Sequence, residues 1–136
     1  MGNSLDALAS YFRPQVDDFL GRADAAGLDL VVVDTDRTPN EQVQKVILGV
    51  SWTQNSKHLP QPPEGKSEAI DVAPRAYLAM KNWNPGGELW AQIGALGEAC
   101  GMFWGGKWAA HPDPGHFQYQ APANNAEAVQ DAVEGT

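Results

Sequence analysis

The sequence predicts an α+β fold, because segments with the apolar spacing of helices alternate with segments that have the pattern of strands. Helical spacing is clearest over 39–50 and 88–100, and strand patterns occur over 28–33 and 69–73. There is no internal repeat and no linker-like stretch between these segments. We therefore expect one domain over 1–136.

The first 27 residues are expected to form a helical region. Ser4 is the predicted N-cap, and apolar residues follow it at helical spacing, namely Leu5, Leu8 and Phe12. Pro14 either kinks this helix or begins a second one. The apolar face of that second helix would comprise Val16, Phe19, Leu20 and Ala23, and Gly27 would end it.

A strand and a well-marked helix are predicted next. Residues 28–33 are largely apolar and β-branched, which predicts a buried strand. Thr38 and Glu41 have the spacing of a capping box, with Pro39 at the first helical position. The buried side of this helix is expected to comprise Val43, Val46, Ile47 and Val50.

The second half of the chain begins with a loop. The proline-rich stretch Leu59–Lys66 fits neither a helix nor a central strand. Residues 69–73 alternate as a strand does, and Pro74 closes that strand. A helix is expected after Pro85-Gly86-Gly87, with Gly101 as its stop and an apolar stripe of Leu89, Ile93, Leu96 and Cys100.

Two further strands and a tail complete the prediction. Residues 102–104 and 116–120 have strand patterns, and a Gly105-Gly106 turn follows the first of them. The tail, 121–136, is rich in alanine and acidic residues, which predicts a short terminal helix or a frayed end.

The composition limits the classes of function. With 43% hydrophobic and 19% charged residues, the chain has the balance of a soluble globular protein. Nine Lys+Arg against seventeen Asp+Glu disfavour a nucleic-acid-binding face. We expect no membrane anchor and no signal peptide. Cys100 is the single cysteine, expected to be a small buried residue, and it fits folding in a reducing cytoplasm.

Three polar residues have the chemistry of a hydrolytic zinc site. His58, Asp71 and His116 offer two neutral imidazoles and one carboxylate, which leaves a fourth zinc position open for water. Asp113 is available as a base, and Arg37 is suited to hold a carboxylate or an oxyanion. Spacing alone leaves other interpretations open, in which the histidines bind no metal, Asp71 caps a turn and Arg37 forms a surface ion pair.

Other polar and aromatic residues near these positions have two readings each. His111 is either a spare ligand or, as we favour, an exposed loop histidine. Trp104 and Trp108 either line a substrate groove or pack in the core and turn. Ser56 is expected to support the site by hydrogen bonding rather than to act as a nucleophile.

Several motifs occur together in the order of a known family. They are Arg37-Thr38-x-x-Glu41-Gln42, Ser56-x-His58, Ala69-x-Asp71, Trp104-Gly105-Gly106-x-Trp108 and Asp113-x-x-His116-Phe117-Gln118. From about Arg37 to Gln118 the chain thereby resembles the zinc peptidases of the D-alanyl-D-alanine carboxypeptidase (VanY-like) family. Phage members of that family include L-alanyl-D-glutamate endopeptidase endolysins.

The resemblance implies a fold and a set of roles. It implies a small antiparallel sheet flanked by helices, the fold shared with the hedgehog N-terminal domain. It also implies zinc ligands at His58, Asp71 and His116, a catalytic carboxylate at Asp113 and an oxyanion- or substrate-binding arginine at Arg37.

Two features depart from the family pattern. The loop 59–66 lengthens the connection between the first histidine and the aspartate, and Ser67 stands where the family has a glycine. Insertions of this kind cost little free energy, so we expect the ligands to be retained and the cleft reshaped. Asp36 precedes Arg37 where the family often has an aromatic residue, so Asp34 or Asp36 is a candidate partner of the arginine.

The sequence therefore predicts a monomeric zinc metallopeptidase of peptidoglycan stem peptides. The favoured form is a phage endolysin that cuts the L-alanyl-D-glutamate bond after accumulating in the host cytoplasm. The alternatives are a D-alanyl-D-alanine carboxypeptidase or dipeptidase, and a non-catalytic zinc-binding module of a virion.

Overall fold

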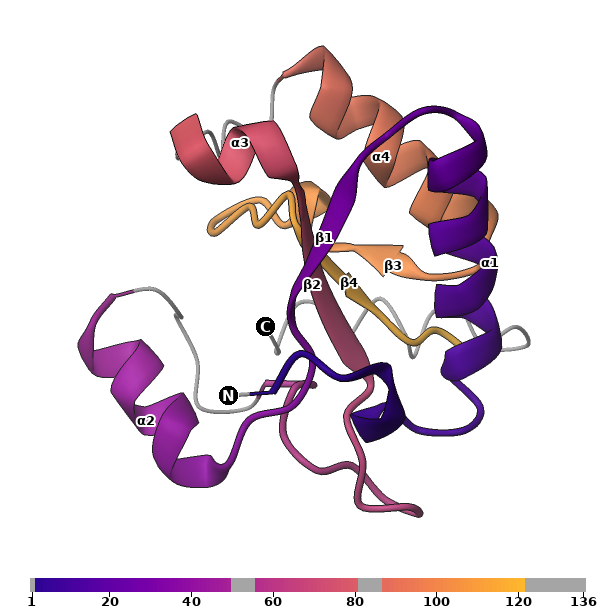
Figure 1. Cartoon of the computed structure of the whole chain (residues 1–136). Coiled ribbons are helices and arrows are strands. Elements are labelled where there is room, and N and C mark those ends of the chain that lie inside the picture. The colour runs from indigo at the N-terminus through magenta and orange to yellow at the C-terminus, as the bar shows by residue number, and fades with distance from the viewer. Residues whose placement is uncertain (1, 50–55, 81–86, 122–136) are drawn as a thin grey trace.

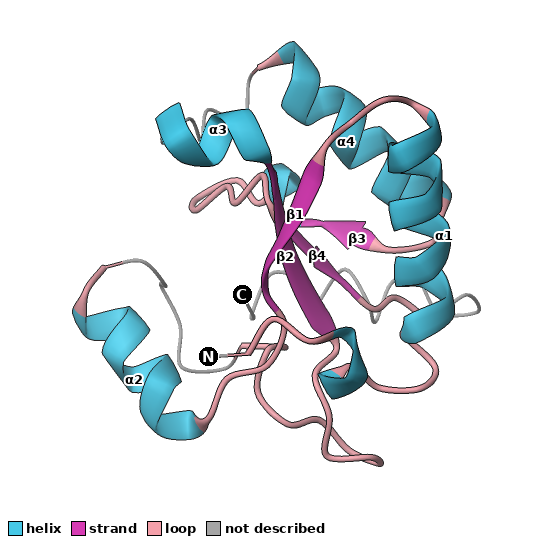
Figure 2. Ribbon diagram, in the orientation of Figure 1, coloured by secondary structure: helices cyan, strands magenta, loops and turns pink. Residues whose placement is uncertain are grey.

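Four short strands form one antiparallel sheet in the order β1-β2-β4-β3. The computed structural model describes residues 2–49, 56–80 and 87–121 (Figure 1). In chain order, the elements are a 3-10 helix at Leu5–Ala7, α1 at Arg13–Ala25, β1 at Leu30–Asp34, α2 at Pro39–Ile47, β2 at Ala69–Pro74, α3 at Arg75–Met80, α4 at Glu88–Ala99, β3 at Phe103–Trp104, a 3-10 helix at Gly105–Lys107 and β4 at His116–Gln118. The predicted α+β class with an antiparallel sheet is confirmed (Figure 2).

The strand register determines which side chains meet across the sheet. β2 pairs with β4 so that Ile70 lies opposite Phe117 and Asp71 lies opposite His116. β1 pairs with the other edge of β2, and Asp34 also lies opposite Asp71, beyond an irregularity in the strand. Asp71 is therefore flanked by a polar residue from each neighbouring strand.

Helices α1 and α4 pack together beside the sheet and enclose the core (Figure 1). The fully buried large side chains include Phe12, Phe19, Ile70, Trp90, Ile93 and Phe117. α4 approaches the strands at two glycines. A Cβ atom on Gly97 would lie 2.3 Å from the Phe117 ring, and one on Gly94 would lie 2.4 Å from the Trp104 ring. Only glycine permits this spacing, because a side chain there would overlap an aromatic ring.

The N-terminal region differs from its prediction before Pro14. Ser4 caps a helix as expected, but this is a 3-10 helix that ends at Ala7, and Leu8 then pairs in extended form with Ser67. Pro14 begins a second helix, which was one of the two predicted alternatives. The predicted apolar face of α1 is buried at Val16, Phe19 and Ala23, whereas Leu20 is partly buried.

Two predictions of burial were wrong. β1 forms as predicted but is an edge strand, and Val33 is 41% exposed. β-Branched composition indicates a strand and does not distinguish an edge from a centre. α2 has the predicted capping box, but Ile47 is 69% exposed, Val43 and Val46 are partly buried, and Val50 lies outside the described residues. This helix lies apart from α1 and α4 (Figure 1), so its apolar side lacks their cover.

The remaining predictions agree with the structure in most respects. The stretch Leu59–Lys66 is a loop, the strand at 69–73 is β2, and those at 102–104 and 116–120 are the shorter β3 and β4. α4 is present, and Gly101 has the positive φ of +90° expected at its end. Its most buried stripe is Trp90, Ile93, Gly94 and Gly97, with Leu89, Leu96 and Cys100 partly buried against the core.

One helix was missed, and two predicted segments are not described. α3, directly after Pro74, has only six residues and no capping signal. Pro85 and Gly86, and all but the first residue of the tail 121–136, lie outside the described residues.

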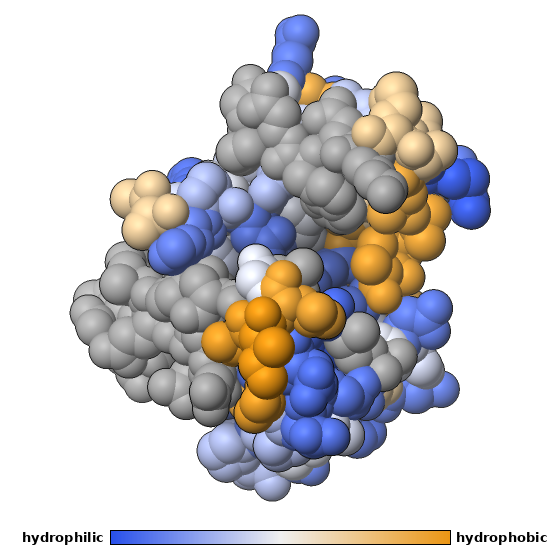
Figure 3. All heavy atoms as spheres, turned by 90° about the vertical axis from the view of Figure 1, so that its left-hand side faces the viewer, coloured by the Kyte–Doolittle hydropathy of each residue, from blue (hydrophilic) through white to orange (hydrophobic). Residues whose placement is uncertain are grey.

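The outer face at the left of Figure 1 is shown in Figure 3. Apolar side chains gather on it in more than one place, beside hydrophilic ones. Large apolar side chains that are exposed on the described part of the molecule include Val33, Ile47, Leu48 and Met80. Within that part, none of the helices combines the length and the apolar character needed to cross a bilayer.

Candidate metal centre

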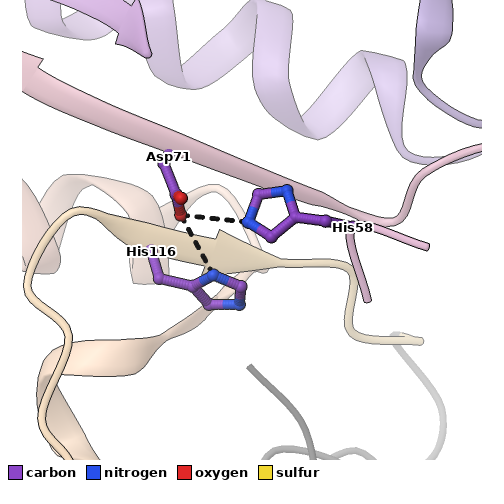
Figure 4. Close-up of side chains that lie close together, drawn as sticks. All are labelled: His58, Asp71 and His116. Carbon is purple, nitrogen blue, oxygen red and sulfur yellow. Dashed lines mark hydrogen bonds and ion pairs between the residues drawn. The ribbon is translucent and has the colours of Figure 1, made fainter. Parts of the chain in front are cut away.

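The three predicted ligands lie together at the sheet (Figure 4). Asp71 comes from β2, His116 from β4, and His58 from the segment just before the proline-rich loop. Asp71 Oδ1 is 3.1 Å from His58 Nε2 and 3.1 Å from His116 Nδ1. One ligand atom from each residue lies within 4.8 Å of the other two. The structure thus brings together residues that are up to 58 positions apart in the chain.

A backbone hydrogen bond determines the orientation of the His58 ring. Its Nδ1 lies 2.8 Å from the Thr35 carbonyl oxygen, which can only accept, so Nδ1 carries the proton. In the neutral ring, Nε2 is then a lone pair that faces the Asp71 carboxylate. This nitrogen is fully buried and has no hydrogen-bond partner among the described residues. A buried acceptor that faces another acceptor is unfavourable unless a cation lies between them.

The His116 ring is oriented in the same way by a side chain. Its Nε2 lies 2.9 Å from Gln118 Oε1 and its Nδ1 lies 3.1 Å from Asp71 Oδ1. Both oxygens accept, so each ring nitrogen donates in the metal-free site, and a cation bound at Nδ1 would replace that proton. Burial lowers the pKa of His116, but Asp71 and then Asp113 outweigh burial and raise it overall. Burial raises the pKa of Asp71, but His58 and His116 hold it well below its usual range. The site therefore favours a carboxylate and attracts positive charge.

Three potential ligand atoms that converge in this way suit a divalent cation. In each histidine, one ring nitrogen contacts an oxygen outside the cluster, namely Nδ1 in His58 and Nε2 in His116. The other ring nitrogen is directed at the Asp71 carboxylate. At zinc sites a histidine usually binds the ion through one ring nitrogen and donates a hydrogen bond from the other. The residues present therefore fit the ion that the sequence predicts.

Arg37 lies beside this cluster and is not at the surface. It is 8% exposed, so the alternative of a surface ion pair was wrong. Its Nε donates to Asp34 Oδ2 over 2.7 Å, so Asp34 is its partner, whereas Asp36 accepts from the Thr35 hydroxyl. Its Nη2 donates to Asp71 Oδ2 over 3.3 Å. The guanidinium thus contacts the oxygen of Asp71 that the histidines do not face.

Asp113 lies in the turn before β4 and belongs to the same electrostatic environment. Its N–H donates to the Gly105 carbonyl over 2.9 Å, and its own carbonyl accepts from the His116 N–H over 3.2 Å. Burial and then the negative charge of Asp71 raise the pKa of Asp113 to about 6. A carboxylate with a raised pKa next to a cation site, and outside the ligand cluster, has the properties of a general base.

The aromatic residues near the site pack rather than stand free. Trp104 is 9% exposed and donates its Nε1–H to the Pro114 carbonyl over 2.8 Å. Trp108 is 6% exposed, and its ring lies 4.9 Å from that of His116. This favours the packing reading for both. His111 is exposed, as expected.

The two serines near the site act through hydrogen bonds. The Ser56 hydroxyl accepts from the His58 N–H over 3.1 Å, which agrees with its predicted supporting role. The Ser67 hydroxyl lies 2.5 Å from the Thr35 carbonyl oxygen, the same oxygen that accepts from His58.

A family model described as D-alanyl-D-alanine carboxypeptidase matches residues 49–119, just over half of the chain. The chain belongs to this family. The match includes His58, Asp71, Asp113 and His116, and Arg37 lies before it. As a member of this carboxypeptidase family, the chain is an enzyme of the peptidase class.

Solved structures support the same fold for this family member. One is the L-Ala D-Glu endopeptidase ChiX of Serratia marcescens, at 22% identity and a TM-score of 0.62, over 90% of this chain and 87% of that one. Another is the LD-carboxypeptidase LdcB, at 14% identity and a TM-score of 0.56, over 92% of this chain and 63% of that one. A comparison with curated proteins found no match.

Several residues that shape the site in this member of the D-alanyl-D-alanine carboxypeptidase family were given no role from the sequence, although Gln42 and Gln118 stand in the motifs quoted above. They are Thr35, which holds His58, Gln118, which holds His116, and Gln42, which contacts Arg37. Gln118 had a usable signal, because residues two apart in a strand share a face and His116 is two residues earlier. Thr35 and Gln42 act through contacts that no local pattern reveals.

Proposed function

We propose that this chain is a zinc metallopeptidase that hydrolyses peptidoglycan stem peptides, with His58, Asp71 and His116 as the zinc ligands. The observation that carries the proposal is the buried Nε2 of His58, which lacks a hydrogen-bond partner among the described residues and faces a carboxylate. Membership of a D-alanyl-D-alanine carboxypeptidase family supports the substrate class.

The bound zinc and Asp113 would have separate roles in amide hydrolysis. When bound, zinc lowers the pKa of a coordinated water to about 7 and polarises the scissile carbonyl. Asp113 accepts the proton of the attacking water and transfers it to the leaving amine nitrogen. The pKa of about 6 belongs to the metal-free chain, and a bound cation would lower it and so favour the carboxylate form that accepts the proton. The raised pKa rests on burial and on the charge of Asp71, both of which are built into the fold.

Within this class we favour cleavage of the L-alanyl-D-glutamate bond by a phage endolysin. The similarity to the L-Ala D-Glu endopeptidase ChiX extends over 87% of that chain, against 63% of the LD-carboxypeptidase LdcB. We further propose one catalytic domain over 1–136 that acts as a monomer and accumulates in the host cytoplasm before it reaches the wall. A D-alanyl-D-alanine carboxypeptidase or dipeptidase would use the same ligands, and a non-catalytic virion module would need no Asp113.

Digestion of purified peptidoglycan by the zinc-loaded and the chelated protein tests the proposal, with the products read by mass spectrometry. Zinc-dependent release of stem peptides that lack their N-terminal alanine is the expected result. Loss of a terminal D-alanine alone would move the activity to the carboxypeptidases, and rapid cleavage of a free dipeptide with intact walls untouched would indicate the dipeptidase. Bound zinc without any cleavage would favour the virion module.

Variants assign the roles within the site. His116→Ala should lose zinc and activity together, whereas Asp113→Ala should keep zinc and lose activity. His111→Ala is the matched control, because this histidine is exposed and lies outside the ligand cluster. Hydrolysis retained by Asp113→Ala would remove Asp113 from the mechanism.

A further inference from the structure

Arg37 is held by three acceptors from three different parts of the fold. Its Nε donates to Asp34 of β1 over 2.7 Å, its Nη1 to Gln42 of α2 over 2.9 Å, and its Nη2 to Asp71 of β2 over 3.3 Å. A planar guanidinium bound on three sides has one orientation. It has little freedom to turn toward a substrate, and it is only 8% exposed.

We propose that Arg37 is a positioning residue for Asp71, held in its turn by Asp34 and Gln42. The inference rests on the proposed metal centre. By occupying Asp71 Oδ2, Arg37 leaves Oδ1 as the single oxygen that faces both His58 and His116. The carboxylate therefore presents one oxygen atom, Oδ1, to the two histidines.

The charges on these residues explain why an arginine is needed at this place. Asp34 and Asp71 are register partners on adjacent strands. Asp34 is buried and Asp71 is partly buried, so their carboxylates repel each other through little solvent. Arg37 contacts both and neutralises one of the two charges. The remaining negative charge lies at Asp71, beside the two histidines, where it attracts a cation.

The burial pattern of α2 gives independent support. Gln42 is the buried residue of this helix, 1% exposed, whereas Ile47 is 69% exposed. The capping box at Thr38 and Glu41 starts the helix one residue after Arg37 and so places Gln42 over the guanidinium. A helix that buries a glutamine in preference to its apolar side chains serves this hydrogen bond rather than the core.

Zinc titration of the purified protein, by calorimetry or competition with a chromophoric chelator, tests the inference. Arg37→Lys keeps the charge but cannot bridge three acceptors, so its zinc affinity should fall by about 10- to 100-fold. Gln42→Met leaves the charge unchanged and removes one acceptor, so its affinity should fall several-fold. Gln15→Met is the matched control, because this amide bonds to Gly101 and Gln120 and not to the site; its affinity should equal wild type.

A kinetic measurement separates positioning from oxyanion binding. At saturating zinc, kcat/KM of Gln42→Met should return close to wild type, because Arg37 keeps its contacts with Asp34 and Asp71. Arg37→Lys with normal zinc affinity and a lowered kcat would overturn the inference and support an oxyanion role. If Arg37→Lys does not fold by circular dichroism, Gln42→Met and Asp34→Asn decide, and unchanged affinity in both overturns it. A wild-type chain that binds no zinc would instead defeat the proposed function.

Discussion

Asp113 should lower the stability of the zinc-free protein, and replacing it by asparagine should show by how much. Burial and the charge of Asp71 raise the pKa of this carboxyl from 3.8 to about 6 in the folded chain. In the unfolded chain it titrates near its ordinary value of about 3.9. Between these values the folded state binds the extra proton, so the contribution of Asp113 to stability falls as the pH rises through this window.

The size of the effect follows from the two pKa values. A difference of about 2 pKa units means that the charged Asp113 destabilises the folded state by about 3 kcal/mol. This destabilisation is fully present above about pH 7 and absent below about pH 4. Asp113→Asn has no charge to bury. As the pH rises from about 4 to about 7, the unfolding free energy of the variant should therefore increase by about 3 kcal/mol relative to that of the wild type. At saturating zinc its hydrolytic rate should fall by about 10²- to 10⁴-fold.

Urea unfolding of the chelator-treated wild type and variant, at several values between about pH 4 and pH 8, measures this difference. The quantity of interest is how the difference in unfolding free energy changes with pH. A packing effect of the amide that does not depend on pH therefore cancels. With zinc bound, the nearby positive charge favours the carboxylate, so the pH dependence should shrink. A difference in stability that stays constant across the range would refute the burial argument for Asp113.

Three further predictions concern the fold and the cation. Gly97→Ala should lower the unfolding free energy by about 1–3 kcal/mol, because its Cβ would lie 2.3 Å from the Phe117 ring; an unchanged urea midpoint would contradict the packing of α4 on β4. Thr38→Ala should cost about 1 kcal/mol in the same assay, because the Glu41 N–H loses its acceptor over 3.1 Å. Zinc at about 1,000 times its Kd should add about 4 kcal/mol, read as a rise in Tm that chelation reverses; no shift would argue against a cation in the cluster.

Local sequence patterns predicted the structure correctly where the stabilising contacts lie within one short segment. The capping box at Thr38 and Glu41 and the helix stop at Gly101 depend on backbone groups within a few residues, and both formed as predicted. Burial depends on what packs against a segment. Residues 28–33 form a strand but lie at the sheet edge, and Ile47 has the helical spacing of a core residue without a neighbouring element to cover it.

The cluster of the candidate site could be proposed from the sequence, whereas its supporting residues could not. His58, Asp71 and His116 were proposed as ligands because zinc binds imidazole and carboxylate groups and because the motifs around them resemble those of the peptidase family. The supports are ordinary groups, such as the carbonyl of Thr35 and the amide of Gln42, and only the tertiary fold gives them their roles.

The pairing of β2 with β4 makes assembly of the metal centre a test of correct folding. Asp71 and His116 are 45 positions apart and meet only because they are register partners across these two strands. A slip of one residue would turn the His116 side chain to the opposite face and put Phe117 opposite Asp71. Chains with misaligned strands would therefore lack the pairing of His116 with Asp71 that the metal centre needs. Only chains with the correct β2–β4 register would bind the ion. Hydrolytic activity would therefore appear only after the non-local contacts of the sheet have formed.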